Sequence, residues 1–471
     1  MTRLMKPNRH HVLVAGGGVA AIEAALALHH LAGRLVKVTV LAPERDFAPR
    51  APAVAAPFGF GASAGIPLTA IAQRTGAAIR RGALTGVKHE SRVALVDDSG
   101  ALSYDTLVVA VGARARAAVP GALTFTGREA VAGLERMLDS AQRGELQRLV
   151  VAVPAGVAWT LPAYELAIMA AVELRDRGAK DTRVTIVTPE PAPLALFGDA
   201  AGTAIARMLE DRGIGLRTGR PHEVRDGQLL LGDAEPLAAD AVVALPALEG
   251  RRLGGLPFDS EGFLPVDRHG RVEGVSRVYA AGDATAFPVK QGGLAAQQAD
   301  ATVEAIAADL GALQHATPFE PVLRGLLLTG GAPLYLRAEL NADGEPARSA
   351  ACTPETGGEI SQRALWWPPG KLAGRYLAPF MATARPSSPA RETMIDRVAR
   401  SVPPTATVDR DEALGLALAV AEQDARLGDY RQAVHALDAA AALSGGVLPS
   451  EYAARRDAWA RIGTHGSADN Y

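Results

Sequence analysis

The 471-residue chain has a single cysteine, Cys352, and this scarcity excludes two kinds of chemistry. One cysteine cannot form an intramolecular disulfide, and it cannot supply a Cys-x-x-Cys redox pair. Cys352 lies in the segment 341–358, which is rich in Gly, Pro, Ser and Asp, a composition typical of a loop. We therefore expect an incidental thiol.

The chain also lacks long apolar runs and a strong net charge. No apolar run reaches the length that spans a bilayer, and no charged-then-apolar leader precedes the first predicted strand, which predicts a cytoplasmic protein. The formal net charge is -2, so no nucleic-acid partner is expected, because such a protein needs a basic stripe to neutralise phosphates. With 48% hydrophobic residues the chain can form substantial cores, and its length is typical of about three domains.

The most informative segment lies near the start of the chain. An apolar strand, 11–15, runs directly into Gly16-x-Gly18-x-x-Ala21, and an alanine-rich helical stretch follows over 22–31. In such a strand-turn-helix the glycines let the backbone turn tightly and let a pyrophosphate approach. The free N–H groups at the helix start, aided by the helix dipole, favour negative charge. The segment therefore predicts a dinucleotide site.

The elements that follow form two similar patterns. Strands are predicted at 36–41, around 78–87, at 92–96 and at 104–113, with a proline-rich loop containing Arg50 after the first of them. The last strand is a continuous apolar run that ends at Gly112, where only a small residue lets backbone approach a phosphate. A second strand-helix-strand-helix pattern runs over 149–153, 161–177, 184–187 and 199–212.

The second strands of the two patterns also share a sequence. The segment 38–44 reads VTVLAPE, and the segment 184–190 reads VTIVTPE. This match suggests a duplicated nucleotide-binding fold. Chance is the alternative, because the strands of all βαβ units share a composition.

These features and a later motif together resemble a known family. The later motif is Val278-Tyr279-Ala280-Ala281-Gly282-Asp283, and a G-x-G-x-x-A that agrees with a downstream Ala-Gly-Asp after a strand is a specific combination. The chain resembles the FAD-dependent pyridine nucleotide-disulfide oxidoreductases, which have two dinucleotide-binding domains. The resemblance covers roughly 9–310 and is greatest to the branch of sulfide:quinone oxidoreductases and type II NADH dehydrogenases.

The resemblance implies a bound FAD and the residues that hold it. In this family the glycine turn lines the pyrophosphate, and the Asp of the Gly-Asp motif hydrogen-bonds the ribityl or phosphate region. The acid that usually ends the second strand and holds the adenosine ribose is displaced, since Ala42 occupies its place, and Glu44 is the nearest substitute. The expected FAD-contacting residues are Gly16, Gly18, Ala21, Glu44, Arg50, Val87, Ala110, Gly112, Gly282, Asp283, Lys290 and Gly292.

Lys290 is the first of two candidate catalytic residues. It precedes Gly292 and an alanine-rich helix that runs to about 310. In similar proteins the equivalent helix points its N-terminus at the pyrimidine edge of the isoalloxazine ring, where backbone N–H groups and the dipole stabilise the anionic reduced flavin. Lys290 would add a positive charge beside them. The alternative is a solvated lysine at a loop tip.

The second pattern departs from the family. In place of a second G-x-G-x-x-G it carries Pro154-Ala155-Gly156-Val157-Ala158-Trp159, in which only the glycine stands at a motif position. Proline has no N–H, and tryptophan replaces the glycine that allows close helix–strand packing. This loss favours the sulfide:quinone branch, which lacks a working nicotinamide site here. The missing cysteine pair argues against that branch, because its members use cysteines next to the flavin.

Glu165 is the second candidate catalytic residue. It follows Trp159 and Tyr164 at the carboxyl ends of the predicted strands, where a ligand would bind. The aromatic pair could form a substrate slot in which Glu165 donates or accepts a proton. The alternative is that the aromatic residues pack in the core and that the glutamate complements the dipole of its helix.

The remainder of the chain is expected to add two parts. A strand pair is predicted over 319–330 and 333–337; in similar flavoproteins a small sheet here covers the flavin and contributes to dimerisation, so a homodimer is expected. Trp366 and Trp367 could contact a membrane peripherally or pack inside the protein. Amphipathic helices are predicted at 411–427, 431–443 and 450–461, and the first two resemble a tetratricopeptide unit that could bind a protein partner.

We therefore expect an α/β protein with two Rossmann-like (βαβ) nucleotide-binding-type domains. The FAD-binding domain would span 9–130 and 241–310, the second domain 146–240, a small C-terminal α+β region 311–390 and a helical, TPR-like tail 391–471. The expected function is an FAD-dependent oxidoreductase that passes electrons from a small reductant to an acceptor such as a quinone, without a metal, in the cytoplasm or peripherally at the inner face of the membrane. The alternatives are an NAD(P)H-dependent reductase and a flavin-stabilised scaffold that recruits partners through the tail.

Overall fold

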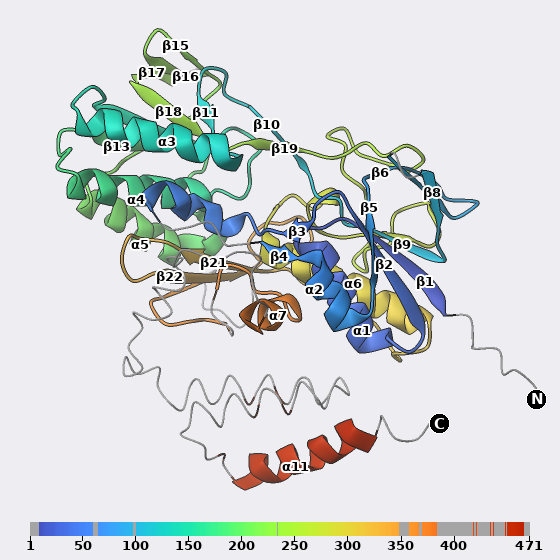
Figure 1. The fold of residues 1–471 in the computed structure, drawn as a ribbon. Helices are drawn as coiled ribbons and strands as arrows, with labels where there is room; N and C mark the ends of the chain where they lie inside the picture. The colour runs from blue at the N-terminus through green and yellow to red at the C-terminus, as the bar shows by residue number, and fades with distance from the viewer. Residues whose placement is uncertain are drawn as a thin grey trace, which may run out of the picture. The chain divides into compact units, whose positions relative to one another are not determined.

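The computed structural model describes residues 9–59, 65–97, 100–232, 234–347, 358–366, 370–383, 418, 421, 434, 437, 448 and 450–465. The chain divides into two compact units. The first consists of 1–362 and 370–396, and the second of 363–369 and 397–471. All the strands found in the described residues belong to the first unit (Figure 1).

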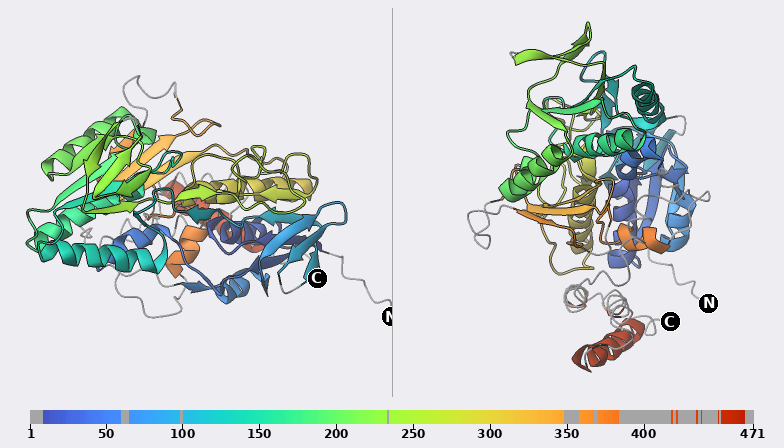
Figure 2. Two further views of the ribbon diagram at one scale, coloured as in Figure 1. Left: turned by 90° about the horizontal axis from the view of Figure 1, so that it is seen from above. Right: turned by 90° about the vertical axis from the view of Figure 1, so that its left-hand side faces the viewer.

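A five-stranded parallel sheet forms the centre of the first domain. Its strand order is β20-β9-β1-β2-β5. The bounds are β1 (His10–Ala15), β2 (Val36–Ala42), β5 (Ala78–Arg81), β9 (Thr106–Val109) and β20 (Val278–Ala280). Helices α1 (Val19–Ala32) and α6 (Gly292–Asp309) pack side by side on one face of this sheet (Figures 1 and 2). An antiparallel sheet of β6 (Leu84–Lys88), β7 (Val93–Val96) and β8 (Gly100–Ser103) packs on the other face.

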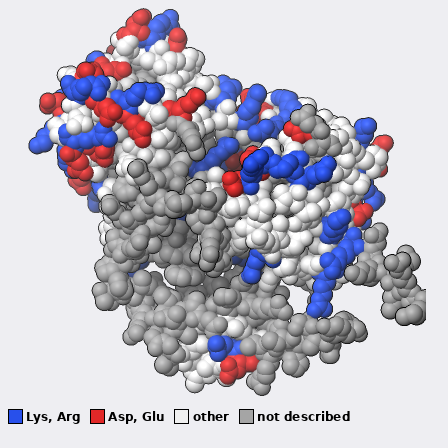
Figure 3. Space-filling view, in the orientation of Figure 1, with Lys and Arg blue, Asp and Glu red and all other residues white. Residues whose placement is uncertain are grey.

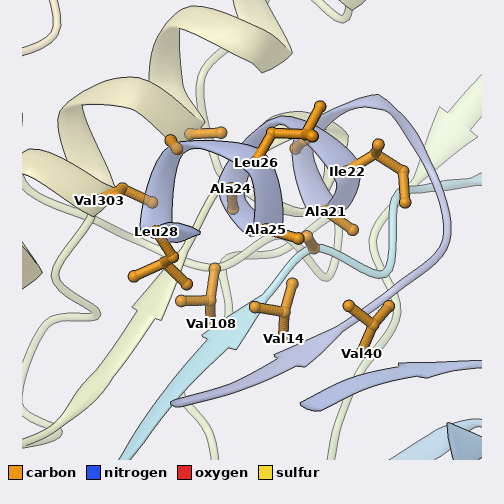
Figure 4. Packing of buried hydrophobic residues seen from close by; sticks show 14 of the residues in the cluster. Val14, Ala21, Ile22, Ala24, Ala25, Leu26, Leu28, Val40, Val108 and Val303 are labelled. Carbon is orange, nitrogen blue, oxygen red and sulfur yellow. The ribbon is translucent and has the colours of Figure 1, made fainter. Parts of the chain in front are cut away.

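The alternation of side chains along β1 explains these layers. Val12 and Val14 belong to the apolar core under α1 and α6, whereas Leu13 and Ala15 belong to the core under the antiparallel sheet. Figure 4 shows Val14 facing the small side chains of α1. Alanines in this helix let its backbone approach the sheet closely, which brings its N-terminus to the carboxyl ends of the strands.

The second domain repeats the arrangement of the first. Its parallel sheet has the order β11-β18-β12-β13-β14, and β12 pairs with β13 and β18 as β1 pairs with β2 and β9. The bounds are β11 (Leu123–Thr124), β12 (Arg148–Ala152), β13 (Arg183–Thr188), β14 (Gly215–Thr218) and β18 (Ala241–Ala244). Helices α3 (Gly127–Gln142), α4 (Leu161–Asp176) and α5 (Gly198–Asp211) accompany it, and a small sheet of β15 (Glu223–Arg225), β16 (Gln228–Leu231) and β17 (Ala234–Ala238) packs against it. This correspondence supports a duplicated fold.

Two antiparallel strands carry the chain from one domain to the other and back. They are β10 (Arg114–Arg116) and β19 (Ala247–Glu249), and the side chains of Arg114 and Glu249 form an ion pair across them. The remaining short elements are β3 (Asp46–Phe47), η1 (Ala51–Phe58), β4 (Ile66–Pro67), α2 (Leu68–Thr75), η2 (Ala195–Phe197) and η3 (Gly282–Ala284). The single strand expected around 78–87 is wrong: the chain leaves the parallel sheet after β5, turns at Gly82 and enters the antiparallel sheet as β6.

A third sheet of β21 (Val322–Leu327), β22 (Leu334–Glu339) and β23 (Gly358–Ser361) follows. Its first two strands correspond to the strand pair predicted over 319–330 and 333–337. Gln291, the N-cap of α6, and Gln297 within this helix bind the outer edge of β21. The Gln291 Nε2 donates to the Arg324 carbonyl (3.0 Å), and Gln297 both donates to the Val322 carbonyl (2.9 Å) and accepts from the Val322 N–H (3.0 Å). The sheet is thereby fixed to the helix whose N-terminus borders the predicted cofactor site. Helix α7 (Leu377–Thr383) comes next.

Most of the predicted helical tail lies outside the described residues. The third predicted helix is present as α11 (Ser450–His465). Within the described part of the second unit, Leu418, Ala421 and Leu437 form a small apolar cluster, and Tyr452 and Trp459 pack against it. The tetratricopeptide-like interpretation stays a prediction.

Two surface properties bear on the predicted partners. Among the helices that the structure describes, none combines the length and the apolar character needed to cross a membrane. On the face shown in Figure 3, acidic and basic side chains are interspersed over the second domain at the upper left, with no stripe of one sign there. This mixture accords with the formal net charge of -2.

Candidate functional site

Gly16 joins the ends of two strands in the first domain. Its N–H donates to the Leu41 carbonyl (2.8 Å), and a Cβ at this position would lie 2.1 Å from the carbonyl oxygen of Ala110. Its φ of +141° is a conformation that favours glycine. Gly16 therefore lets β1 approach β9 at the edge where the site was predicted.

The space in front of the first turn of α1 is open. Gly18 is the N-cap of α1, has an extended backbone, and as a glycine supplies no side chain to cap the helix. A Cβ on Gly18 would meet no atom within 4 Å, and the same holds for Gly112, which follows β9. The N–H groups of a helix's first turn have no partner inside the helix, so an anionic group fits here.

Ala21 lies behind this turn rather than at its surface. Its side chain is fully buried in the core between α1 and the sheet (Figure 4). The structure thus places it where the third small residue of such a motif allows close helix–strand packing. The methyl group of Ala21 therefore does not face a ligand. Its small size can help only by letting α1 lie close to the sheet.

The first turns of α1 and α6 meet at Gly282. A Cβ there would lie 2.9 Å from the Cβ of Ala20 and 3.3 Å from that of Ala295, and its φ is +75°. Gln298 of α6 holds this turn, because its buried Oε1 accepts from the Gly282 N–H at 2.7 Å. Two helix N-termini therefore begin beside the turn that carries Asp283.

Two positive charges act on Asp283, one from the same loop and one from a distant segment of the chain. Burial raises the pKa of its carboxyl, while the charges of Lys290 and Arg50 act in the opposite direction. Arg50 comes from the proline-rich loop and is exposed. The structure thus brings together three residues that the sequence assigned to one site from separate motifs.

Lys290 is bound inside the site and is not a solvated loop-tip lysine. Its Nζ donates to the Thr285 carbonyl and lies 3.7 Å from the centre of the Phe263 ring. Burial lowers the pKa of the ammonium to about 8, opposed chiefly by the negative charge of Asp283. Lys290 therefore holds the Gly282–Thr285 turn and places a titratable cation beside Asp283.

Gln291 caps the helix that begins at Gly292. Its Oε1 accepts from the Leu294 N–H at 2.9 Å, while its Nε2 binds the edge of β21. A Cβ on Gly292 would lie 2.6 Å from the Cδ2 of Leu372, so the first turn of α6 is covered by a residue from far along the chain.

Replacing Gln291 by Ala is expected to lower the free energy of unfolding by about 1–2 kcal/mol, because both a helix cap and a strand-edge hydrogen bond are lost. Urea unfolding followed by circular dichroism measures this change. Gln147→Ala is the control, since Gln147 is exposed. Equal midpoints for the two variants would contradict the role given to this cap.

Val87 and Glu44, two further residues predicted to contact the cofactor, differ in their exposure. Val87 is buried in the core of the first domain, and its N–H donates to the Gly254 carbonyl at 2.7 Å, so its contact with a cofactor stays a prediction. Glu44 is exposed beside the glycine turn: its Oε2 lies 2.9 Å from where a Cβ on Gly17 would be. The Glu44 carboxylate therefore still reaches the glycine turn, although it stands two positions after Ala42, where the family has its acid.

The equivalent acid of the second domain is engaged internally. Glu190 accepts hydrogen bonds from the hydroxyls of Thr160 (2.9 Å), Tyr164 (2.8 Å) and Thr188 (3.0 Å). Burial raises its pKa, and these hydroxyls lower it. The Trp159 ring packs edge-on against Phe197, with centroids 6.1 Å apart. The carboxylate that would hold a second nucleotide's ribose is thus saturated by this chain's own side chains.

Glu165 is fully buried in an ion pair. Its two carboxylate oxygens lie 2.5 and 2.7 Å from the Nζ of Lys371, and one accepts from the Leu328 N–H at 2.9 Å. Burial raises the pKa of Glu165, and the Lys371 charge lowers it. This geometry favours a structural role that connects α4 to the C-terminal segment over exchange of a proton with a substrate.

Gln298, Lys371 and Glu190 are among the residues of the site that the sequence analysis missed. Gln298 and Lys371 carry no local signal, because a glutamine in a helix and a lysine in a loop are ordinary. Glu190 had a signal: it ends the segment that matches 38–44, the segment that ends in Glu44. What the match could not show is that three hydroxyls would occupy its carboxylate.

Residues 10–306 match the family model described as pyridine nucleotide-disulphide oxidoreductase. The chain belongs to this family. An NADH dehydrogenase-like protein of Mycobacterium tuberculosis is 31% identical over 234 residues, which are 47% of this chain and 58% of that protein. The sulfide-quinone reductase of Aquifex aeolicus is 26% identical over 208 residues, 43% of this chain and 48% of that protein. The chain spans about half the length of the curated relatives it matches.

A solved structure extends the likeness in fold. The sulfide:quinone oxidoreductase from Aquifex aeolicus aligns with a TM-score of 0.64 at 18% sequence identity, covering 75% of this chain and 87% of that one. At this identity the likeness concerns the fold alone. The family and the α/β fold with two dinucleotide-binding-type domains, both expected from the sequence, are confirmed.

Proposed function

We propose that this chain is an FAD-dependent oxidoreductase that takes electrons from a small donor other than NAD(P)H and passes them to an acceptor of the quinone class. The observation that supports this most is the contrast between its two nucleotide-type sites. The first has open space before Gly18 and an exposed Glu44 beside the turn. In the second, Glu190 is saturated by three hydroxyls.

The residues of the first site fit FAD. The open turn at Gly18 and the N–H groups of α1 would hold the pyrophosphate, and Glu44 would bind the adenosine ribose. Asp283 would bind the ribityl region, with Arg50 near enough to balance its charge. FAD supplies reversible two-electron storage when bound there.

The chain's own groups would favour added negative charge next to α6. Gln291 orders the first turn of this helix through its cap, and the dipole of the helix is positive at that end. Lys290 adds a cation fixed by the Thr285 carbonyl and the Phe263 ring. These charges are in place before any reaction, so no reorganisation is needed when charge develops.

The second domain supports a donor other than a nicotinamide. Pro154 removes one N–H from the turn that would bind a pyrophosphate, and Trp159 stands at its end. Because a quinone acceptor would be dissolved in the membrane, we propose that the protein contacts the inner face of the membrane peripherally. We further propose a homodimer, with the third sheet as part of its interface.

Absorbance spectroscopy on the purified protein tests the proposal. We expect a yellow protein whose flavin absorbance is lost on adding dithionite or sulfide, persists on adding NADH or NADPH, and returns on adding a soluble quinone. Dithionite controls for a reducible flavin. A protein that is colourless and refuses added FAD would contradict the cofactor assignment.

The NADH dehydrogenase-like relative of Mycobacterium tuberculosis favours a second candidate, an NAD(P)H-dependent reductase. The same experiment separates the two. Rapid bleaching by NADH would support this candidate and would show that Pro154 and Trp159 do not prevent nucleotide binding.

A further inference from the structure

A cavity lies at the end of the first domain that is opposite to the proposed cofactor site. Its volume is about 440 Å³, and it is lined by residues of the segment 271–279 and by Asp309 at the end of α6. This segment leads into the amino end of β20, whereas Gly282 follows the carboxyl end of the same strand. The cavity is therefore separate from the turns at Gly18 and Gly282. Its volume is in the range of small-molecule sites, roughly 300–1,000 Å³.

Among the described residues that line the cavity, Asp309 is the only acid, and its charge is already balanced. Its Oδ2 accepts from the Tyr279 hydroxyl at 2.7 Å, and its Oδ1 accepts from the Arg271 guanidinium at 3.3 Å. Both carboxylate oxygens are thus engaged by this chain's own side chains. Asp309 therefore leaves the other charges of the cavity uncompensated.

Arg277 supplies one such charge. It is exposed, it lines the cavity, and it forms no ion pair with any residue that the structure describes. Its backbone is fixed to the parallel sheet, because the Arg277 carbonyl accepts from the Leu107 N–H at 3.0 Å. A guanidinium is a planar fork of donors that matches the oxygens of a carboxylate or a phosphate. Arg277 is therefore a fixed cation that is available to an anion in the cavity.

The same loop contributes backbone donors. The N–H groups of Gly274, Ser276 and Arg277 donate to no acceptor within the described part of the chain. All three residues line the cavity. Three free N–H groups and one guanidinium suit the several terminal oxygens of a phosphate monoester better than the two oxygens of a carboxylate.

A second arginine adds to the positive charge at this end of the sheet. Burial lowers the pKa of His10, at the start of β1; the charge of Asp105 opposes this effect, and the charges of Arg277 and Arg92 add to it. Like Arg277, Arg92 forms no ion pair with a residue that the structure describes. The electrostatic field around the cavity therefore favours an anion.

The backbone of Arg277 has an unusual conformation. Its φ is +61°, in the left-handed region where glycine and asparagine are tolerated far better than arginine. A residue held in this region lowers the stability of the fold, and such residues cluster at ligand sites. A strained arginine at the wall of a cavity therefore supports a binding role for its side chain.

We propose that this cavity binds a small organic phosphate at a site separate from the cofactor site. The Arg277 guanidinium and the N–H groups of the loop 274–277 would bind the phosphate oxygens. The organic part would occupy the remaining volume beside Arg271 and Tyr279. This inference goes beyond the proposed function and does not rest on it, because the cavity and its charges belong to the chain alone.

A titration of glycerol 3-phosphate with the full-length protein, followed by ³¹P NMR, tests the proposal. The protein is first saturated with FAD. We expect saturable binding by the wild type and at least about tenfold weaker binding by Arg277→Asn, because the guanidinium is lost. Arg80→Asn is the matched control, since Arg80 is exposed on β5 and does not line the cavity. Equal affinities of the two variants would overturn the proposal.

Urea unfolding without the phosphate separates binding from a structural role of Arg277. Asparagine adopts the left-handed conformation more readily than arginine, so Arg277→Asn should unfold at a higher urea concentration than the wild type. A structural role for the arginine predicts the opposite, a lower midpoint, and this result would overturn the proposal.

Ser276→Asp is a second binding variant that leaves the arginine in place. It adds a negative charge to the wall of the cavity and should also weaken the binding of glycerol 3-phosphate. Succinate tests the assignment to phosphate: it should bind more weakly than glycerol 3-phosphate, and equal affinities would overturn that assignment. Unchanged phosphate affinity in Ser276→Asp would place the ligand outside the cavity.

The open turn at Gly18 is the competing location for an anion. In the absence of FAD, Gly18→Val should still bind glycerol 3-phosphate with the affinity of the FAD-saturated wild type. Loss of binding in Gly18→Val, together with unchanged affinity in Arg277→Asn, would place the phosphate at the cofactor turn and overturn the proposal. A protein that binds no FAD would refute the proposed function, and the Arg277→Asn titration would still decide whether the cavity binds phosphate.

Discussion

Gly18→Val is expected to abolish tight FAD binding while the protein stays folded. The backbone of Gly18 is extended, with φ of −91° and ψ of −170°, so valine can adopt it without strain. A Cβ there meets no protein atom within 4 Å, so the added methyl groups would occupy the space proposed for the pyrophosphate. We expect FAD affinity to fall by about 100-fold or more, which corresponds to roughly 3 kcal/mol.

Titration of the apoprotein with FAD, followed by flavin fluorescence, measures this loss. Gly254→Val is the matched control, because Gly254 also has no atom within 4 Å of its Cβ position. Circular dichroism should show both variants folded. Wild-type affinity in a folded Gly18→Val protein would place the cofactor elsewhere.

The second large effect is expected at Lys371, the partner of fully buried Glu165. Lys371→Met removes the only cation paired with that carboxylate in the described residues and leaves a buried charge without compensation. Breaking such a pair costs about 3–5 kcal/mol in the free energy of unfolding. Urea unfolding of the wild type and the variant measures the difference.

The double variant Glu165→Met with Lys371→Met separates charge from packing. Replacing both members of a buried pair by apolar groups is often nearly neutral, so the double variant should recover most of the loss. Arg143→Met, which breaks an exposed pair with Glu145, should leave the urea midpoint unchanged. A double variant as unstable as the single one would show that the pair's charges are not what stabilises this junction.

The parts of the fold that could be predicted from the sequence are those with a local signature. The turn at Gly16 and Gly18 could be predicted, because the spacing of small residues after an apolar strand is dictated by the geometry of this single turn. The buried strand β9 was visible in its continuous apolar run, as expected for a strand covered on both faces. Asp283 was placed by a motif of the same local kind.

The pairings between distant residues could not be predicted. Lys371 and Glu165 are 206 positions apart, and Glu165 looked like a residue of an open first turn. Glu23 lies among alanines in α1, where an acidic residue would ordinarily face water, yet it is fully buried and accepts hydrogen bonds from the distant Tyr376 and Leu377 N–H groups. Burial of a polar side chain is decided by which elements meet, and that information is not contained in the neighbouring residues.

The glutamines that bind the outer edge of β21 also affect how this protein behaves in a crowded solution. An uncovered strand edge is a template on which another chain can add a strand, and this route leads to aggregation. Gln291 and Gln297 occupy backbone groups of Val322 and Arg324 that would otherwise invite such pairing. The third sheet is therefore protected on this side against the intermolecular β-pairing that begins amyloid growth.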